Sequence, residues 1–271
     1  MFFKYLKYKF IILYIYMINC YWGGYFDSPI TLDKCPNNID IVTLAFAGPD
    51  EYSKLSTGFL CSRYNKQTIT SWMNKIKVNN PKLKILLSII DNPENHWNSI
   101  DLKIFAQSTK QVIDEWGFDG IDIDAESGMP MKDYNNRFIE LITLLDDIIQ
   151  FKNNNKVFSY TCYTGDSLTD GIILQYTKQY FDFINLMAYF DSVQEYEELY
   201  NIYKSYYDSD NIFIGVKAGA ENDDSRTPVN IVKPLVEFKK NIKKGMMLWT
   251  LNRDCKKFTG KPDFTWLNLI N

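Results

Sequence analysis

The sequence has too few histidines and too widely spaced cysteines for a typical zinc site. His96 is the only histidine in 271 residues, and no Cys-x-x-Cys pair occurs. Zinc sites need several such ligands at short spacings, so we expect no metal site of this kind. The cysteines are Cys20, Cys35, Cys61, Cys162 and Cys255. Their odd number leaves at least one free thiol unless a partner chain pairs with it, and Cys35 with Cys61 is the candidate disulfide outside a reducing compartment.

Other absences narrow the class of function. No Gly-rich phosphate-binding pattern follows the first expected strand, which argues against a nucleotide-binding sheet and predicts no cofactor of that kind. The net charge is −3 and the pI about 5.4, so a nucleic-acid partner is not expected. No low-complexity tract, long linker or Asn-x-Ser/Thr sequon is present, and glycosylation therefore gives no support for secretion.

The first residues have the pattern of a targeting segment. Lys4, Lys7 and Lys9 precede an uncharged apolar run at 10–26, as in a signal peptide. The run is also close to the shortest length that spans a membrane. We expect 1–17 to be a signal peptide or a membrane anchor, and 18–271 to form one domain. The protein is then secreted or extracytoplasmic, with membrane anchoring as the alternative.

Eight short apolar segments alternate with helical patterns along the chain. The expected strands are 18–22, 40–46, 84–89, 120–125, 157–162, 183–188, 212–216 and 245–251. The expected helices are 67–78, 101–116, 133–152, 193–207 and 229–240, and the helical signals after the first and last strands are weak. Nearly continuous apolar strands are typical of parallel sheets that are buried on both faces. Eight repeats in this length predict an α/β fold, a single (β/α)8 TIM barrel.

One expected strand is unusually acidic. Residues 118–126 read FDGIDIDAE. Residues two apart share a face of a strand, so Asp122, Asp124 and Glu126 point into the barrel, and Ile121, Ile123 and Ala125 point toward the helices. Glu126 lies at the carboxyl end, where barrel active sites are found. Crowding and burial raise the pKa of at least one of these acids, and a carboxyl that keeps its proton is what a general acid requires.

Three other interpretations of this segment are weaker. A calcium loop has polar or glycine spacers in an exposed loop, whereas Ile121 and Ile123 are typical of buried positions. A magnesium site at a barrel mouth usually draws its carboxylates from different strands. A purely structural role requires the burial of three acids without a function, which is costly.

The segment DGIDIDAE at 119–126 resembles the DGxDxDxE signature of the family 18 glycoside hydrolases, which include chitinases and endo-β-N-acetylglucosaminidases. The resemblance extends from about residue 18 to 264. YWGG at 21–24 is similar to the end of the family's first strand, and LLSII at 86–90 lies at its third. FINLMAY at 183–189 resembles the sixth strand, and GMMLWTLNRD at 245–254 resembles the eighth.

The resemblance implies a retaining mechanism in which the substrate assists. Glu126 would protonate the glycosidic oxygen while the substrate's own acetamido carbonyl attacks the anomeric carbon. Asp124 would orient the acetamido group and stabilise the oxazolinium ion, and Asp122 would share a proton with Asp124. Tyr189 would bind the acetamido oxygen. The remaining implied positions are Trp249, Met187, Asp191, Trp22 and Tyr163 for sugar binding, with Asp119 and Gly120 as structural parts of the motif.

The sequence departs from the family pattern at two places. Phe190 follows the tyrosine where the family has a polar residue, and Asp191 comes one position later. Ser88 is kept in the third strand, but Ile90 and Asp91 replace glycines. The segment between the seventh and eighth strands is also too short for the insertion domain of many chitinases, so we expect an open cleft.

The sequence leaves more than one substrate and more than one set of sugar-binding residues open. Chitin and the chitobiose core of N-glycans both fit, and a binding protein without catalysis is the alternative from another class. Trp97, His96 and Tyr163 follow expected strands, where they line further sugar subsites or pack within loops. We expect the protein to act as a monomer.

Overall fold

A computed structural model describes residues 16–90, 97, 99–126, 132–163, 167–190, 192–219 and 226–271. Most of the expected signal or anchor segment, together with His96 and Asp191, lies outside the described residues. Within the ranges just given, no helix combines the length and the apolar character that a membrane span requires.

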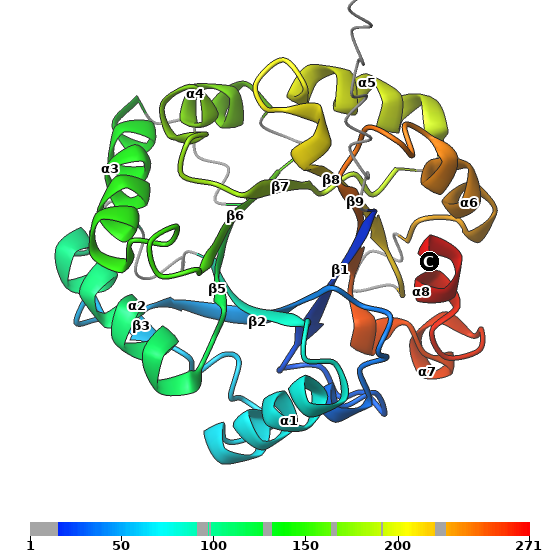
Figure 1. Ribbon diagram of the computed structural model, residues 1–271, viewed down its shortest axis with the longest axis horizontal. Helices are drawn as coiled ribbons and strands as arrows, with labels where there is room; N and C mark the ends of the chain where they lie inside the picture. The colour runs from blue at the N-terminus through cyan, green and yellow to red at the C-terminus, as the bar shows by residue number, and fades with distance from the viewer. Residues whose placement is uncertain are drawn as a thin grey trace, which may run out of the picture.

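Eight parallel strands close into a barrel, as the sequence predicts (Figure 1). They are β1 (Met17–Gly23), β2 (Ile41–Pro49), β4 (Lys84–Ile90), β5 (Gly120–Ala125), β6 (Val157–Cys162), β7 (Phe183–Leu186), β8 (Ile212–Lys217) and β9 (Gly245–Trp249). Each strand pairs with its neighbours in the order of the chain. Because β1 pairs with both β2 and β9, the sheet has no open edge. The two-residue strand β3 (Leu55–Ser56) pairs antiparallel with the end of β2.

Helices surround the barrel on its outer side (Figure 1). They are α1 (Lys66–Asn79), α2 (Leu102–Trp116), α3 (Lys132–Ile149), α4 (Ser167–Thr177), α5 (Val193–Tyr203), α6 (Val229–Glu237), α7 (Lys256–Thr259) and α8 (Thr265–Ile270). Three begin at residues whose side chains accept a backbone N–H of the first turn, namely Asn65, Asp101 and Ser192, which is the usual chemistry of a helix start. Between β8 and β9 the described residues hold α6 as the only α-helix, which agrees with a barrel that has no large insertion.

The sheet separates two apolar layers. Between strands and helices lies a large core that includes Ile121 and Ile123 of β5, both fully buried. Inside the barrel lies a smaller cluster that includes Tyr21, Phe46, Met187 and Met247. Successive side chains of a strand point to opposite faces, so each strand contributes to both layers.

All five cysteines are free thiols, so the expected Cys35–Cys61 disulfide is wrong. Cys35 is buried, its Sγ lies 3.7 Å from the carbonyl oxygen of Pro36, and burial raises the pKa of its thiol to about 12. Cys61 is half-buried, and its Sγ lies 4.0 Å from Oγ1 of Thr57. Each thiol therefore has its own local partner.

Candidate active site

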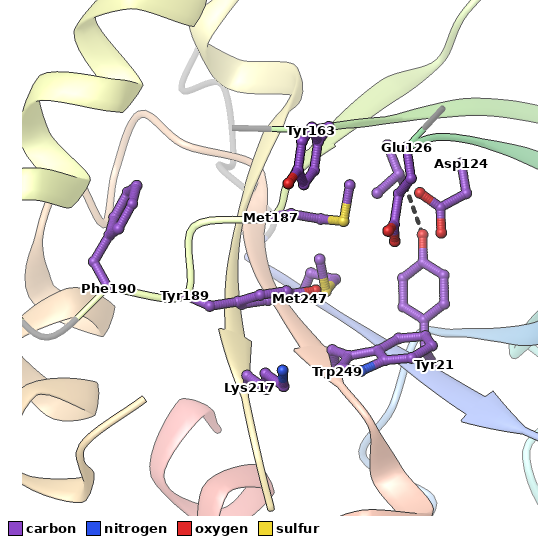
Figure 2. A pocket seen from close by; sticks show the side chains of 11 residues that line it. Tyr21, Asp124, Glu126, Tyr163, Met187, Tyr189, Phe190, Lys217, Met247 and Trp249 are labelled. Atoms are coloured by element: carbon purple, nitrogen blue, oxygen red, sulfur yellow. Dashed lines mark hydrogen bonds between the residues drawn. The ribbon is translucent and has the colours of Figure 1, made fainter. Parts of the chain in front are cut away.

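A pocket of about 310 Å³ opens at the carboxyl ends of the strands. It is lined by Tyr21, Asp124, Glu126, Thr161, Tyr163, Met187, Tyr189, Phe190, Lys217, Met247 and Trp249. These residues come from five strands, β1, β5, β6, β8 and β9, and from the segments that follow β5, β6 and β7. Figure 2 shows the two carboxylates facing the Tyr189 and Trp249 rings across this space.

The start of β5 is fixed by the two residues that begin the acidic motif. Asp119 accepts the backbone N–H of Ile85 at 2.7 Å and forms an ion pair with Lys77, also at 2.7 Å. Gly120 lies so close to β6 that a Cβ atom there would be 1.9 Å from the carbonyl oxygen of Val157. These contacts set the register of β5, and with it the positions of the acids that follow.

Asp122 is fully buried in the barrel interior, where it receives four hydroxyl groups. Its Oδ2 accepts from Tyr21 at 2.7 Å and from Ser88 at 2.9 Å, while its Oδ1 accepts from Ser159 at 2.7 Å and from Thr161 at 2.9 Å. Burial raises the pKa of Asp122, and the four hydrogen bonds act in the opposite direction. Ser88 thus donates a hydrogen bond directly to an acid of β5.

Proton counting explains why a raised pKa suits Asp122. The Tyr21 and Thr161 hydroxyls also contact each other at 2.6 Å. Tyr21, Thr161 and Asp122 therefore make three mutual contacts, and each contact needs one proton. The two hydroxyls supply two protons, so an ionised Asp122 leaves one contact unfilled. A protonated Asp122 donates to one of the two hydroxyls instead of accepting from it, and all three contacts are then filled.

The network continues beyond Asp122 across the barrel. The Asn185 amide donates to the Thr161 hydroxyl at 2.9 Å, and its oxygen accepts from Asn19 at 3.1 Å. Asn19 in turn accepts from the hydroxyl of Thr43 at 3.0 Å. Side chains from β1, β2, β6 and β7 are thereby joined to the central acid of β5, which holds the floor of the pocket rigid.

Asp124 and Glu126 form the acidic wall of the pocket. Asp124 is 3% exposed, whereas Glu126, just beyond the end of β5, is exposed to solvent. The acids thus rise from the buried Asp122 to the accessible Glu126, as strand alternation predicts. Glu126 is therefore the acid of the motif that a substrate reaches most readily.

Aromatic and sulfur-containing side chains form much of the remaining lining of the pocket. Trp249, at the end of β9, and Tyr189, after β7, are both half-buried. Met187 is 7% exposed and Tyr163 is 40% exposed. These four of the six expected substrate-contact residues therefore line the same pocket as the acids. Asp191 lies outside the described residues.

The expected sugar contact of Trp22 is not supported, because this side chain points out of the barrel. Trp22 is 1% exposed within the outer core, where its indole N–H donates to the Ile30 carbonyl at 3.2 Å. Its neighbour Tyr21 takes the inward place and lines the pocket. The alternation of side chains along β1 could have identified Tyr21 as the inward residue, because Tyr21 shares a face of the strand with the polar residue Asn19.

Five residues of the lining were not expected as site residues, namely Tyr21, Thr161, Phe190, Lys217 and Met247. Lys217 ends β8 and is 7% exposed, with its Nζ 5.8 Å from the centroid of the Tyr189 ring. Phe190 also lines the pocket, and its ring packs edge-on against Tyr196 at 5.4 Å. In Figure 2 the Phe190 ring lies beyond Tyr189, away from the carboxylates. This apolar residue thus braces the segment that carries Tyr189.

Trp97 lies in the core and not in the pocket. It is fully buried against Phe105 and Phe138 of α2 and α3, which decides between the packing and subsite interpretations in favour of packing. Within the described ranges, no group of three or more His, Cys, Asp or Glu side chains is placed to hold a metal ion.

Comparisons with known proteins agree with this geometry. The family model described as Glycosyl hydrolases family 18 matches residues 17–211. Chitotriosidase-1 of Mus musculus is 30% identical over 197 residues, a match that covers 65% of this chain and 41% of that protein. The match thus spans less than half the length of this relative.

Two solved structures with the same fold come from Cycas revoluta and Paenibacillus barengoltzii. A family GH18 chitinase from Cycas revoluta, in complex with (GlcNAc)3, has a TM-score of 0.75 at 15% identity, with 94% of this chain and 98% of that chain covered. A family 18 N-acetylglucosaminidase from Paenibacillus barengoltzii has a TM-score of 0.71 at 14% identity, with 94% and 99% covered. These likenesses establish the fold, and the family match covers well over half of the sequence. The chain belongs to the glycosyl hydrolases family 18.

Proposed function

We propose that this protein hydrolyses β-1,4 bonds that follow N-acetylglucosamine in chitin-type substrates. The observation that carries the proposal is the arrangement of one pocket. Asp124 and the accessible Glu126 lie on one side, and Trp249 and Tyr189 lie on the other. A carboxyl group facing flat aromatic walls provides both a proton donor and a surface for the apolar face of a sugar ring.

Glu126 acts as general acid and then as general base. Its exposure at the pocket opening allows it to reach the oxygen of the bond that is cleaved. After the leaving group departs, the same carboxylate activates the water that completes hydrolysis. One residue serves both steps because giving its proton to the leaving group leaves a carboxylate, which then takes a proton from the incoming water and is restored to its starting state.

The nucleophile in this proposal is the acetamido oxygen of the substrate. Among the described residues that line the pocket, the carboxylates are Asp124 and Glu126, both from the β5 segment. A hydrolase with its own nucleophile or base needs a second carboxylate across the sugar from the acid. Attack by the acetamido group needs none, and it gives retention of configuration.

The surrounding residues hold the acetamido group in place. Asp124 orients its N–H and stabilises the positive charge of the oxazolinium ion, and the Tyr189 hydroxyl binds its oxygen. Asp122, whose pKa is raised by burial, anchors β5 through its contacts with four hydroxyls and so positions Asp124 two residues further along the strand. Trp249 supports the sugar ring from below. These roles require an N-acetyl group on the sugar next to the cleaved bond.

The names of two relatives support the proposed substrate class. Chitotriosidase-1 and the chitinase solved with (GlcNAc)3 are named for chitin-type oligomers. We therefore favour chitin or chitooligosaccharides over N-glycans. Release of glycans from a high-mannose glycoprotein, measured beside hydrolysis of colloidal chitin, separates these two substrates.

The replacement Glu126→Gln tests the catalytic assignment. We expect turnover of a chromogenic chitooligosaccharide to fall by at least about 10²-fold, because the amide cannot donate or recover the proton. Glu51→Gln, at an exposed glutamate outside the pocket, is the matched control and retains full activity. Equal rates for the wild type and Glu126→Gln would refute the assignment. If the wild type bound the oligosaccharide but did not hydrolyse it, the protein would be a binding protein without catalysis.

A further inference from the structure

The strands β1 and β9 part at the edge of the pocket. Their ladder of paired residues ends at Cys20 and Leu248, one residue before Trp249. On the other side of β9, the ladder with β8 continues to Trp249, which pairs with Lys217. The backbone ladder thus fixes Trp249 against β8, whereas on the side of β1 it ends one residue earlier.

The side chain of Asn252 continues the connection where this ladder ends. Its amide donates to the carbonyl of Gly23 at 2.8 Å, and its Oδ1 accepts the N–H of Gly23 at 3.2 Å. Gly23 is the last residue of β1, so one amide side chain supplies the donor and the acceptor that a residue of a paired strand can supply. Asn252 therefore joins β1 to the 3₁₀ helix η4 (Leu251–Arg253), which follows β9.

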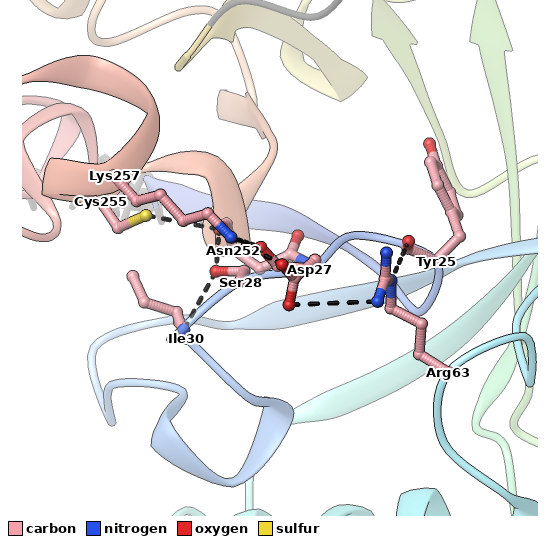
Figure 3. Close-up of polar contacts among 8 residues, drawn as sticks. All are labelled: Tyr25, Asp27, Ser28, Ile30, Arg63, Asn252, Cys255 and Lys257. Atoms are coloured by element: carbon pink, nitrogen blue, oxygen red, sulfur yellow. Dashed lines mark hydrogen bonds and ion pairs between the residues drawn. The ribbon is translucent and has the colours of Figure 1, made fainter.

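Further hydrogen bonds hold Asn252 in this orientation. The Thr250 hydroxyl donates to its Oδ1 at 2.8 Å, and the Ser28 hydroxyl donates to its backbone carbonyl. Ser28 also accepts the N–H of Ile30 at 3.0 Å, which fixes the loop after β1 (Figure 3). Because Asn252 is 1% exposed, these bonds form where little water competes for them.

An ion pair at the surface joins the same two segments (Figure 3). Lys257 of α7 donates to the carboxylate of Asp27 at 2.8 Å and to the backbone carbonyl of the same residue at 2.7 Å. Both side chains are largely exposed, and ion pairs of this kind contribute little to stability. The buried amide of Asn252 is therefore the stronger of the two connections.

The rings that surround Trp249 belong to the segments that Asn252 joins. Trp249 packs edge-on against Tyr21, with the ring centroids 5.5 Å apart, and against Phe26, with the centroids 6.3 Å apart. Tyr21 and Phe26 lie on either side of Gly23 in the sequence. By holding Gly23 against the residues after β9, Asn252 fixes the Trp249 ring between these two neighbours.

We propose that Asn252 is a positioning residue, which sets the place of the Trp249 ring relative to Glu126 and with it the place of the sugar. This inference rests on the proposed function and deepens it. Asn252 acts from outside the pocket lining. The Tyr21 hydroxyl, which donates to Asp122 at 2.7 Å, continues the connection to the acidic strand. Since a misplacement of about 1 Å can lower a rate about 10²-fold, loss of the amide slows turnover in a protein that is still folded.

Steady-state kinetics of the whole chain on a chromogenic chitooligosaccharide, well below the unfolding temperature, test this role. Asn252→Ala should lower kcat about tenfold and change KM less than about threefold, because the sugar still binds but is held away from Glu126. Asn80→Ala is the matched control. The Asn80 amide donates to the carbonyl of Ile39 at 3.0 Å near the amino ends of the strands, so this variant loses stability but keeps its kcat.

The variant Asn252→Asp separates positioning from a purely structural role. A protonated carboxyl at this position can donate to Gly23 as the amide does, whereas an ionised one turns a negative charge toward the same carbonyl. The kcat of the variant should therefore approach that of the wild type at low pH, and the ratio of variant to wild-type kcat should fall as the pH rises. For Asn80→Ala this ratio should not change with pH.

The outcomes separate the two proposals. A wild-type kcat in Asn252→Ala, or a ratio in Asn252→Asp that does not change with pH, would overturn the positioning role and leave the proposed function intact. An equal loss of kcat in Asn252→Ala and Asn80→Ala would also overturn it, since the loss would then follow stability. If Asn252→Ala did not fold, the ratio in Asn252→Asp would decide. If the wild type did not hydrolyse the oligomer, the proposed function would fail and the role of Asn252 with it.

Discussion

At the scale of single residues, the chemistry depends on which face of a strand each side chain occupies. Asp122 and Ile121 are adjacent in the sequence, yet one joins the polar interior network and the other joins the outer core. The same alternation distinguishes Tyr21, which lines the pocket, from Trp22, which packs outside the barrel. A shift of one position exchanges a binding residue for a core residue.

Asp122 should matter for stability as well as for activity. Asp122→Ala removes the acceptor of four buried hydroxyls, and we expect the free energy of unfolding to fall by about 3 kcal/mol or more. Asp122→Asn keeps an oxygen and a donor at the site, so its free energy of unfolding should fall by clearly less than that of Asp122→Ala. Asp114→Ala on α2, at an exposed surface ion pair, is the control and should change stability by less than about 1 kcal/mol. Urea unfolding measures all three, and equal stability of the two Asp122 variants would contradict the network.

Asp254 makes stability depend on pH. It is fully buried, its Oδ2 accepts the backbone N–H of Leu267 in α8 at 2.8 Å, and burial raises its pKa from 3.8 to about 6. Between these values the folded protein keeps the proton that the unfolded chain has lost. The contribution of Asp254 to stability is therefore greatest below pH 3.8 and falls as the pH rises to about 6.

The replacement Asp254→Asn removes this titration and keeps an acceptor for Leu267. We compare the free energy of unfolding of the wild type with that of Asp254→Asn. The difference should fall by about 3 kcal/mol as the pH rises from 3.8 to about 6. Denaturant unfolding of both proteins at a series of pH values measures the difference. Parallel stability profiles would show that Asp254 does not titrate as its burial implies.

At the scale of elements, the sequence predicts those parts whose patterns are local. Strands β5 and β6 occur at the expected 120–125 and 157–162, because each is a short apolar or alternating run between breakers. Strand β7 ends at Leu186, two residues early. Its expected continuation, Met187 and Ala188, still points one side chain into the pocket. Periodicity therefore places side chains better than it places the ends of a strand.

Elements without a local pattern were not predicted. Helix α4 was absent from the expected set, because its sequence SLTDGIILQYT contains a central glycine and lacks a clear apolar stripe. Its structure depends on tertiary contacts, such as the buried Asp170, which accepts from the hydroxyls of Tyr160 and Tyr203. The stacking of Phe46 on Trp249 was not predicted either, since these two residues lie far apart in the sequence and meet only because β1 pairs with both of their strands and closes the barrel.

At the scale of the whole molecule, closure of the barrel creates the site. Tyr21 on β1, Asp122 on β5 and Asn185 on β7 belong to separate strands, and the closed sheet brings them into one hydrogen-bond network. The acids are then fixed on one side of the pocket, with the aromatic wall opposite. The motif specifies which residues carry the chemistry, whereas the closed barrel supplies their geometry.

The central claim is that Glu126 and the substrate's acetamido group together cleave the bond with retention. Time-resolved proton NMR of freshly formed products from an N-acetylglucosamine oligomer tests it most directly. We predict that the new reducing end appears first as the β-anomer, and that Glu126→Gln forms product at least about 10²-fold more slowly. Initial formation of the α-anomer, or hydrolysis by Glu126→Gln at the wild-type rate, would contradict the claim.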